Sequence, residues 1–294
     1  MELCVYLYFF GWNVMSILEA IILGIIQGLS EFIPISSTAH LTIAGHLLGL
    51  IDPDNPEKWT AFIAVIQLGT LAAVLLYFSK ELRTVPFAFL KENFAEKKKF
   101  GDQSESSRLG WLVIAGSIPI VIVGLLFKDI IESSITKDPY VIGASLIGLA
   151  LILGLAELLA NFKRDMKHLN MKDAAIVGLA QCVALIPGSS RSGTTITAGL
   201  FLGLRRDTAA RFSFLLSIPA VLGSGLFEFY QSLEYLSADM MINLLVATLF
   251  SAVSGYASIA FLLRYLKKRS TLLFIIYRVL IGLAVILMAL NGLL

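Results

Sequence analysis

The chain alternates long apolar runs with short polar segments over most of its length. Six runs are long enough to cross a hydrocarbon core of about 30 Å, which takes about 20 helical residues. These runs lie at 59–79, 110–127, 140–160, 209–227, 241–263 and 272–293. The pattern predicts an all-α integral membrane protein with six full spans, in a single polytopic domain that covers residues 1–294.

Two further apolar stretches, 16–50 and 174–204, are each interrupted near the middle by a polar turn. The first turn is Pro-Ile-Ser-Ser-Thr at 34–38, and the second is Pro-Gly-Ser-Ser-Arg-Ser-Gly at 187–193. Irregular backbone at membrane depth must be buried in protein or line a wet cavity, because lipid offers it no hydrogen bonds. We therefore expect each stretch to form two half-helices around a re-entrant loop.

The charges of the loops favour this arrangement. Loops 80–108, 163–172 and 264–269 are basic, whereas acidic residues are the majority of the charges in 128–139 and 228–240. Cytoplasmic loops carry excess Lys and Arg. If both broken stretches re-enter, all three basic loops are cytoplasmic and both termini lie outside. If 174–204 crossed the membrane, the later loops would invert.

Short motifs recur in the two halves of the chain. Gln27 precedes Pro34-x-Ser36-Ser37 much as Gln181 precedes Pro187-x-Ser189-Ser190, and the tripeptide Ser-Ile-Pro occurs at 117–119 and again at 217–219. Weak internal similarity combined with opposite insertion indicates an inverted-topology repeat, with the ligand site at the repeat interface. The tips of the two hairpins would then meet inside the membrane.

Composition excludes several classes of protein. Hydrophobic residues make up 57% of the 294 residues and charged residues only 15%, which is not the profile of a soluble domain. A net charge of +2 spread over several loops gives no block for nucleic acid. Cys4 and Cys182 fit neither a zinc site nor a disulfide framework and are read as packing residues. Residues 1–14 lack the features of a secretory signal, and Met15 is an alternative native start.

The first polar motif places a carboxylate in an apolar stretch. Gln27 and Glu31 are four residues apart and share a helix face, and three hydroxyl residues and His40 follow directly. An ionised carboxylate near the bilayer centre costs roughly 2.5–3.5 kcal/mol, so Glu31 is by default a functional residue. The alternative is that Glu31 sits at the membrane interface and hydrogen-bonds a helix end.

The second motif places Arg191 among hydroxyls and glycines at the start of a half-helix. Free backbone N–H groups and the helix dipole make such a start an anion site, and Gly188 and Gly193 allow close backbone approach. The guanidinium adds a planar fork that matches phosphate oxygens. A structural alternative is that Arg191 pairs with Glu31 to hold the two hairpins together.

Together the two motifs supply an anion cradle, a carboxylate, a histidine and candidate hydroxyl nucleophiles, a set that suits phosphoryl transfer. Serines in such turns are also common helix caps, and we interpret Ser36 and Ser189 as caps. Three charged residues of the spans, Glu157, Arg211 and Arg278, lie within pairing or snorkelling reach of a helix end and are interpreted as structural.

Residues 27–40, QGLSEFIPISSTAH, and 187–195, PGSSRSGTT, resemble the undecaprenyl-diphosphatase family, also called the bacitracin-resistance family. The resemblance runs from about Met15 to the C-terminus. It implies hydrolysis of undecaprenyl diphosphate to undecaprenyl phosphate and inorganic phosphate, which recycles the lipid carrier for peptidoglycan and other cell-wall glycans and gives bacitracin resistance. It also implies Mg²⁺ or Ca²⁺, inverted repeats, and a site open to the outer face of a bacterial plasma membrane.

The same resemblance assigns roles to residues of the two motifs. Ser37 is the expected nucleophile, with His40 or Glu31 as its base, although His40 as nucleophile and direct attack by water stay open. Glu31 is the expected main ligand of the cation. The residues expected to hold the diphosphate are Arg191, Ser190 and Thr195, with Gln27, Thr38, Gly188 and Ser192 as further contacts.

The sequence departs from the family pattern at two positions. Position 27 is Gln where many members have Glu, which puts a two-carboxylate cation site in doubt, and Ala39 stands where glycine is common. The strongest rival function is a polyprenyl-phosphate transporter or flippase with the same inverted-repeat architecture, because an anion cradle need not cleave what it binds. A purely structural protein would not need charge beside hydroxyls in the membrane. A homodimer is compatible with the sequence.

Overall fold

The computed structural model describes residues 15–52, 54–133, 138–232 and 238–294. The expected N-terminal extension, residues 1–14 with Cys4, lies outside these ranges. The described helices are α1 Ile17–Phe32, α2 Ser37–Leu47, α3 Pro56–Tyr77, α4 Ser79–Leu90, α5 Glu105–Leu126, α6 Lys128–Glu132, α7 Pro139–Leu159, α8 Met171–Cys182, α9 Arg191–Phe201, α10 Arg206–Ser232, α11 Ala238–Leu266 and α12 Leu272–Leu290. Short 3-10 or π turns add Lys91–Ala95, Phe100–Asp102, Met166–His168 and Val183–Leu185.

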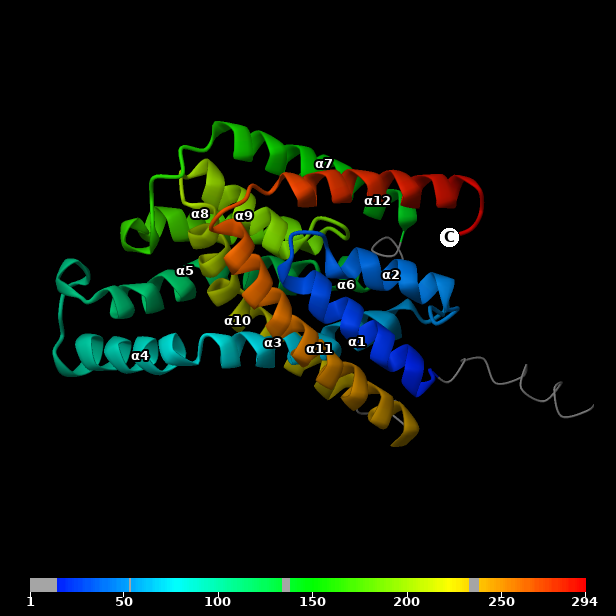
Figure 1. Ribbon diagram of the computed structural model, residues 1–294. Coiled ribbons are helices and arrows are strands. Elements are labelled where there is room, and N and C mark those ends of the chain that lie inside the picture. The colour runs from blue at the N-terminus through cyan, green and yellow to red at the C-terminus, as the bar shows by residue number, and fades with distance from the viewer. Residues whose placement is uncertain (1–14, 53, 134–137, 233–237) are drawn as a thin grey trace, which may run out of the picture.

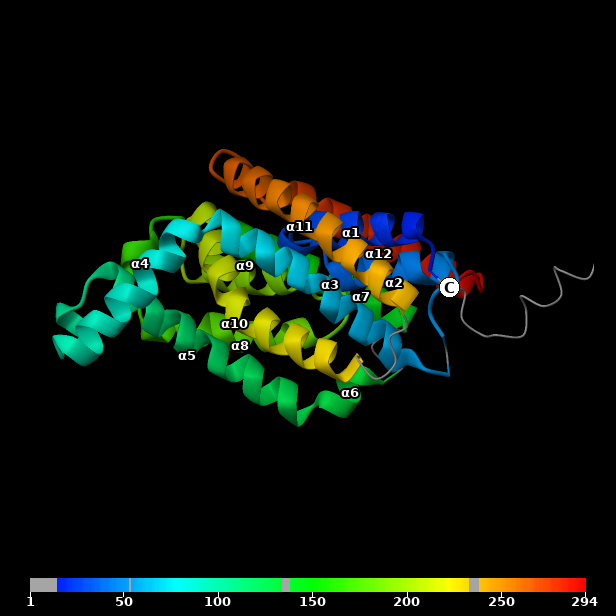
Figure 2. The ribbon, with the colours of Figure 1, turned by 90° about the horizontal axis from the view of Figure 1, so that it is seen from below.

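The six predicted spans are confirmed. Six of the described helices are long and apolar enough to cross a membrane, at Lys58–Tyr77, Glu105–Leu126, Pro139–Leu159, Arg206–Phe227, Met241–Leu266 and Leu272–Leu290. They form the bundle of Figure 1, in which α7 and α12 pack side by side, and α4 and the start of α5 extend together beyond the other helices in both views (Figures 1 and 2). The protein is an all-α membrane protein.

Both expected helix breaks are present. A turn at 33–36 separates α1 from α2, and the segment 183–190 separates α8 from α9. Ser36 and Ser190 have positive φ angles of 75° and 69°, and the side chain of each accepts a hydrogen bond from a backbone N–H of the helix that follows. The cap expected at Ser36 is confirmed. The cap expected at Ser189 is wrong, because the Ser189 hydroxyl donates to the Ile186 carbonyl at 2.6 Å and Ser190 caps α9 instead.

The helix contacts repeat between the two halves of the chain. α1 packs on α11 and α8 packs on α5, while α3 packs on α11 and α10 packs on α5. The order α1, α2, α3, α5, α7 thus corresponds to α8, α9, α10, α11, α12. An added Cβ at Gly24 of α1 would lie 2.3 Å from the Ala247 oxygen of α11, and one at Gly178 of α8 would lie 2.3 Å from the Gly116 oxygen of α5. The two helix pairs therefore approach backbone to backbone in the same way.

The repeat register differs from the one expected from the prolines. Gly24 and Gly178, Gln27 and Gln181, and Ser36 and Ser190 are all separated by the same length of chain. Matching Pro34 to Pro187 shifts this register by one residue. The Ser-Ile-Pro tripeptides do not correspond at all, because the first lies on α5 and the second on α10, and these helices are not equivalent in the repeat.

Ion pairs hold two of the span ends in place, as expected. Arg206 at the start of α10 pairs with Glu157 of α7, whose other oxygen accepts from the Thr271 hydroxyl at 2.8 Å. Arg211 of α10 pairs with Glu81 of α4. Each pair joins two helices that are far apart in the sequence, so these residues serve the packing of the bundle.

Candidate active site

A cavity of about 500 Å³ lies between the tips of the two broken helix pairs and the helices α3, α5 and α10. One end is polar and is lined by Glu31, Ser37, Gln67, Ser190 and Arg191. The walls are mostly apolar and include Ile63, Ala64, Ile120, Val121, Leu125, Val221 and Phe227. A polar group attached to an apolar chain therefore matches the lining of this cavity.

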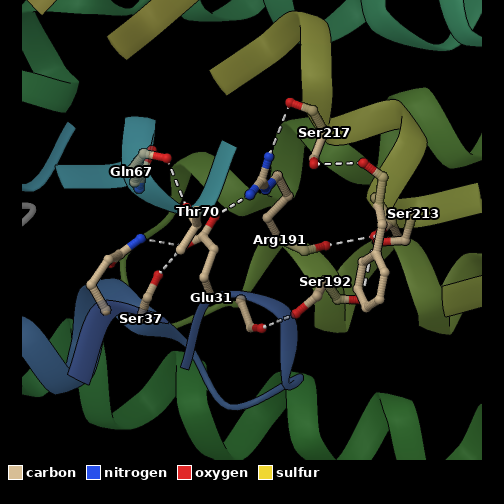
Figure 3. A network of polar contacts seen from close by, with 12 residues as sticks. Glu31, Ser37, Gln67, Thr70, Arg191, Ser192, Ser213 and Ser217 are labelled. Carbon is tan, nitrogen blue, oxygen red and sulfur yellow. Dashed lines mark hydrogen bonds and ion pairs between the residues drawn. The ribbon is translucent and has the colours of Figure 1, made fainter. Parts of the chain in front are cut away.

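Glu31 is the centre of the polar end and is only 6% exposed. Its Oε2 accepts hydrogen bonds from the Ser37 hydroxyl at 2.6 Å and from Gln27 Nε2 at 3.0 Å. Its Oε1 forms an ion pair with Arg191 of α9, as Figure 3 shows. The pair between Arg191 and Glu31, which was the structural alternative for Arg191, is therefore present in the structure. The alternative of a carboxylate that hydrogen-bonds a helix end at the membrane interface is wrong, because Glu31 binds three side chains inside the bundle.

Arg191 is held from two sides on the first turn of α9. Its Nη1 donates to the Ser217 carbonyl of α10 at 3.3 Å, on the far side from Glu31 (Figure 3). The Thr195 hydroxyl donates to the Arg191 carbonyl at 2.7 Å and lies 2.6 Å from the Ser213 hydroxyl. Thr195 does not line the cavity. In this structure Thr195 supports the helix turn that carries Arg191.

His40 points away from Ser37. Its Nδ1 lies 2.7 Å from the Ser36 carbonyl, and its Nε2 lies 2.7 Å from the Tyr277 hydroxyl of α12, with the two rings stacked 5.6 Å apart. A carbonyl oxygen only accepts, so Nδ1 carries the proton and Nε2 accepts from Tyr277. His40 does not line the cavity. The structure therefore brings Ser37 together with Glu31, and not with His40.

Arg278 was missed as a residue of the site by reasoning from the sequence. It is fully buried, and its Nη2 donates to the carbonyls of Gly188 at 3.2 Å and Ser189 at 2.9 Å. The guanidinium fixes the loop before α9, so Arg278 is structural as predicted, but through buried loop carbonyls and not by snorkelling to a helix end. Its Nε and Nη1 have no hydrogen-bond partner among the described residues. An arginine in the middle of an apolar run was the signal for such a role.

Some of the other residues predicted to contact the diphosphate line the cavity, and others support the residues that line it. Thr38, Gly188 and Ser190 line the cavity. Ser192 does not line the cavity. Its hydroxyl donates to the Ile33 carbonyl at 3.3 Å, which connects α9 to the turn between α1 and α2. Gln27 lies behind Glu31, fully buried, with an Oε1 that has no partner among the described residues.

Several lining residues were not predicted at all. Among them are Thr42, Trp59, Thr60, Gln67, Lys128 and Ser224. On α3 the lining positions 60, 63, 64 and 67 recur at helical spacing, so that face could have been found from the periodicity once the partner helices were known. In the described part of the chain no three His, Cys, Asp or Glu residues cluster closely enough to hold a metal ion by themselves.

Comparison with known proteins identifies the family. The family model described as "Bacitracin resistance protein BacA" matches residues 20–284. The undecaprenyl-diphosphatase of Syntrophobacter fumaroxidans is 56% identical over 268 residues, which cover 91% of this chain and 95% of the relative. That of Chlorobium phaeovibrioides is 51% identical over 289 residues, which cover 95% of this chain and 99% of the relative. The chain therefore belongs to the bacitracin resistance protein BacA family.

Proposed function

We propose that this protein hydrolyses undecaprenyl diphosphate to undecaprenyl phosphate and inorganic phosphate. This activity recycles the lipid carrier of peptidoglycan and other cell-wall glycans and gives bacitracin resistance. The relatives are named for this activity, and the chain matches them over 95% and 99% of their length. The observation that carries the proposal is the 2.6 Å hydrogen bond from the Ser37 hydroxyl to Glu31, beside Arg191 at the polar end of an apolar cavity.

The geometry supports attack by Ser37 with Glu31 as its base. The Ser37 hydroxyl gives its proton to Glu31 Oε2 while its oxygen forms a bond to the terminal phosphorus. The bond from that phosphorus to the bridging oxygen breaks, and undecaprenyl phosphate leaves. Water then attacks the phosphoserine, the bond from phosphorus to the Ser37 oxygen breaks, Glu31 returns its proton to that oxygen, and inorganic phosphate leaves with the protons of the water. His40 is a weaker candidate for the base because its Nε2 is engaged by Tyr277.

The turn before α9 would hold the diphosphate. Arg191 presents a guanidinium at the first turn of α9, where free N–H groups and the helix dipole favour an anion. Gly188 and Ser190 line the same end of the cavity. A diphosphate at this position competes with Glu31 for the guanidinium, which frees the carboxylate to act as a base as the substrate binds.

The residues present fit a divalent cation that arrives with its substrate. Mg²⁺ commonly binds to one or two carboxylates plus substrate phosphates, and Glu31 is the carboxylate that lines this cavity among the described residues. The buried Oε1 of Gln27, which has no partner among those residues, offers a neutral oxygen next to Glu31. A bound Mg²⁺ or Ca²⁺ would offset charge on the diphosphate and its leaving group.

The direction of the cavity supports an opening at the outer face. The cavity runs toward the N-terminal end of α3 and the C-terminal ends of α5 and α10, where Trp59, Lys128 and Phe227 line it. The basic loop 80–108 and Arg205–Arg206 lie at the opposite ends of these three helices. The positive-inside rule assigns those ends to the cytoplasm. We propose that both broken pairs re-enter, so that the three spans after each pair make the two halves inverted and the site faces the outside of the bacterial plasma membrane.

A lipid transporter is the second candidate, and the repeated helix contacts of the two halves favour it. Product analysis separates the two. Detergent-purified protein would be incubated with undecaprenyl diphosphate, with and without Mg²⁺ or Ca²⁺, and the lipid and phosphate products quantified. We expect one phosphate per undecaprenyl phosphate formed. Intact lipid after incubation with well-folded protein would contradict the hydrolase and favour the transporter.

A further inference from the structure

Thr42 of α2 carries a buried hydroxyl that the proposed mechanism does not use. The residue is only 2% exposed, and it lines the cavity. A buried threonine in a helix commonly donates to the carbonyl four residues back, as Thr197 does to Gly193 at 2.6 Å. The Thr42 hydroxyl makes no such bond to Thr38 and has no hydrogen-bond partner among the described residues. It is therefore available to a ligand in the cavity.

The other half of the repeat shows that the fold does not need a hydroxyl at this position. The register that matches Ser36 to Ser190 also matches Thr42 to Ile196 of α9, which is 0% exposed. Both positions lie in the second turn of a half-helix that begins at the catalytic end of the cavity. A buried polar group without a partner lowers stability, and the isoleucine avoids that cost. A ligand explains the polar side chain at position 42 better than packing does.

Thr42 lies between the catalytic end of the cavity and its mouth. It is five residues along α2 from Ser37, or about 7 Å. Further along, α2 packs on Trp59 at the mouth, since an added Cβ at Gly45 would lie 2.5 Å from the Trp59 ring. Thr38 also lines the cavity, and its hydroxyl has no partner among the described residues. The Cβ atoms of Thr38 and Thr42 are about 5–6 Å apart, so one phosphate oxygen between the two hydroxyls can accept from both.

We propose that Thr42, together with Thr38, binds the phosphate that stays on the lipid. Ser37 attacks the terminal phosphorus, and an in-line displacement places the leaving lipid phosphate on the far side of that phosphorus. The apolar walls guide the lipid tail toward the mouth, so the phosphate joined to the tail lies on the mouth side of the terminal one. The Thr42 hydroxyl donates to an oxygen of this group and stabilises the charge that develops there as the bridging bond breaks. This inference rests on the proposed function.

Inhibition by the two products distinguishes the lipid phosphate from the free one. The inhibition constants of undecaprenyl phosphate and inorganic phosphate, and kcat/KM for undecaprenyl diphosphate, would be measured for Thr42→Val and Thr42→Ser. Thr248→Val is the matched control, because the Thr248 hydroxyl of α11 donates to the Leu244 carbonyl at 2.7 Å and Thr248 does not line the cavity. We expect Thr42→Val to raise the constant of the lipid product about tenfold and to lower kcat/KM by a similar factor, with Thr42→Ser close to the wild type.

Constants of Thr42→Val within the range of the Thr248→Val control would overturn the proposal. A rise for inorganic phosphate alone would also overturn it, because the hydroxyl would then serve the cleaved phosphate. The rise in the unfolding temperature of the purified proteins with undecaprenyl phosphate gives a test that needs no turnover. A smaller rise in Thr42→Val than in the wild type supports the position even if the protein hydrolyses no lipid, whereas equal rises count against it.

Discussion

Glu31→Gln is the substitution whose effects follow most directly from the contacts of the site. Gln keeps the shape of the side chain but removes the charge that Arg191 pairs with, and the Arg191 side chain is only 17% exposed. Breaking a buried ion pair on one side costs about 3–5 kcal/mol, because the other charge stays buried. For a chain of 294 residues such a loss corresponds to a fall of roughly 5–8 °C in Tm. The loss of a general base lowers kcat by about 10²–10⁴-fold.

The stability and activity effects of this substitution separate in a double-mutant cycle. Thermal unfolding in detergent and phosphate release would be measured for Glu31→Gln, Arg191→Gln and the double variant. The double variant contains no unpaired buried charge, so it should be more stable than the sum of the single losses predicts, while its activity stays low. Additive stability losses, or near-normal turnover in Glu31→Gln, would refute the reasoning about this ion pair.

Three further substitutions test other contacts. Gln27→Glu should keep activity and tighten its dependence on the cation, since it adds a second carboxylate beside Glu31; an inactive variant would show that the Gln amide has its own role as a donor. Arg278→Met should lower kcat at least tenfold because the loop before α9 loses its donor, with partial rescue by Arg278→Lys, and an unchanged kcat would contradict this. Hydrogen bonds from Ser104 lower the pKa of Glu92 below its ordinary value, so this link stabilises the folded state above the ordinary pKa and is lost as pH falls through the lowered one. Protection of loop 91–104 from hydrogen exchange, corrected for the intrinsic exchange rate at each pH, should therefore fall at low pH in the wild type and already be reduced at neutral pH in Glu92→Gln, whereas equal protection at neutral pH would argue against the link.

The spans and the helix breaks could be predicted because they depend on local composition. An apolar run of about 20 residues has few alternatives to a membrane helix, and a polar turn inside such a run must break it. The contact between Glu31 and Arg191 was available from the sequence as an alternative, because a buried charge needs a partner and few were at hand. Each of these inferences uses only residues that are near in sequence or of opposite charge.

The repeat register and the partners of His40 and Arg278 could not be predicted. The turn before α9 has one more residue between its proline and its cap than the turn before α2 has. Gly188, with a φ of 83°, accommodates the extra residue. Matching the two prolines therefore assigns the cap to Ser189 instead of Ser190. His40 contacts a tyrosine hydroxyl from α12, and Arg278 contacts loop carbonyls. Neither partner carries a charge or a motif that marks it in the sequence.

The measurement that tests the account most directly is phosphate release from undecaprenyl diphosphate by purified wild type, Ser37→Ala and Ser30→Ala. Ser30 is the matched control, a buried serine of the same broken pair whose hydroxyl donates to the Ile26 carbonyl and not to Glu31. The account predicts release by the wild type and by Ser30→Ala that requires a divalent cation, and at least a hundredfold loss in Ser37→Ala at temperatures where all three proteins are folded. Release by Ser37→Ala at the rate of the wild type would contradict the role of Ser37 as nucleophile.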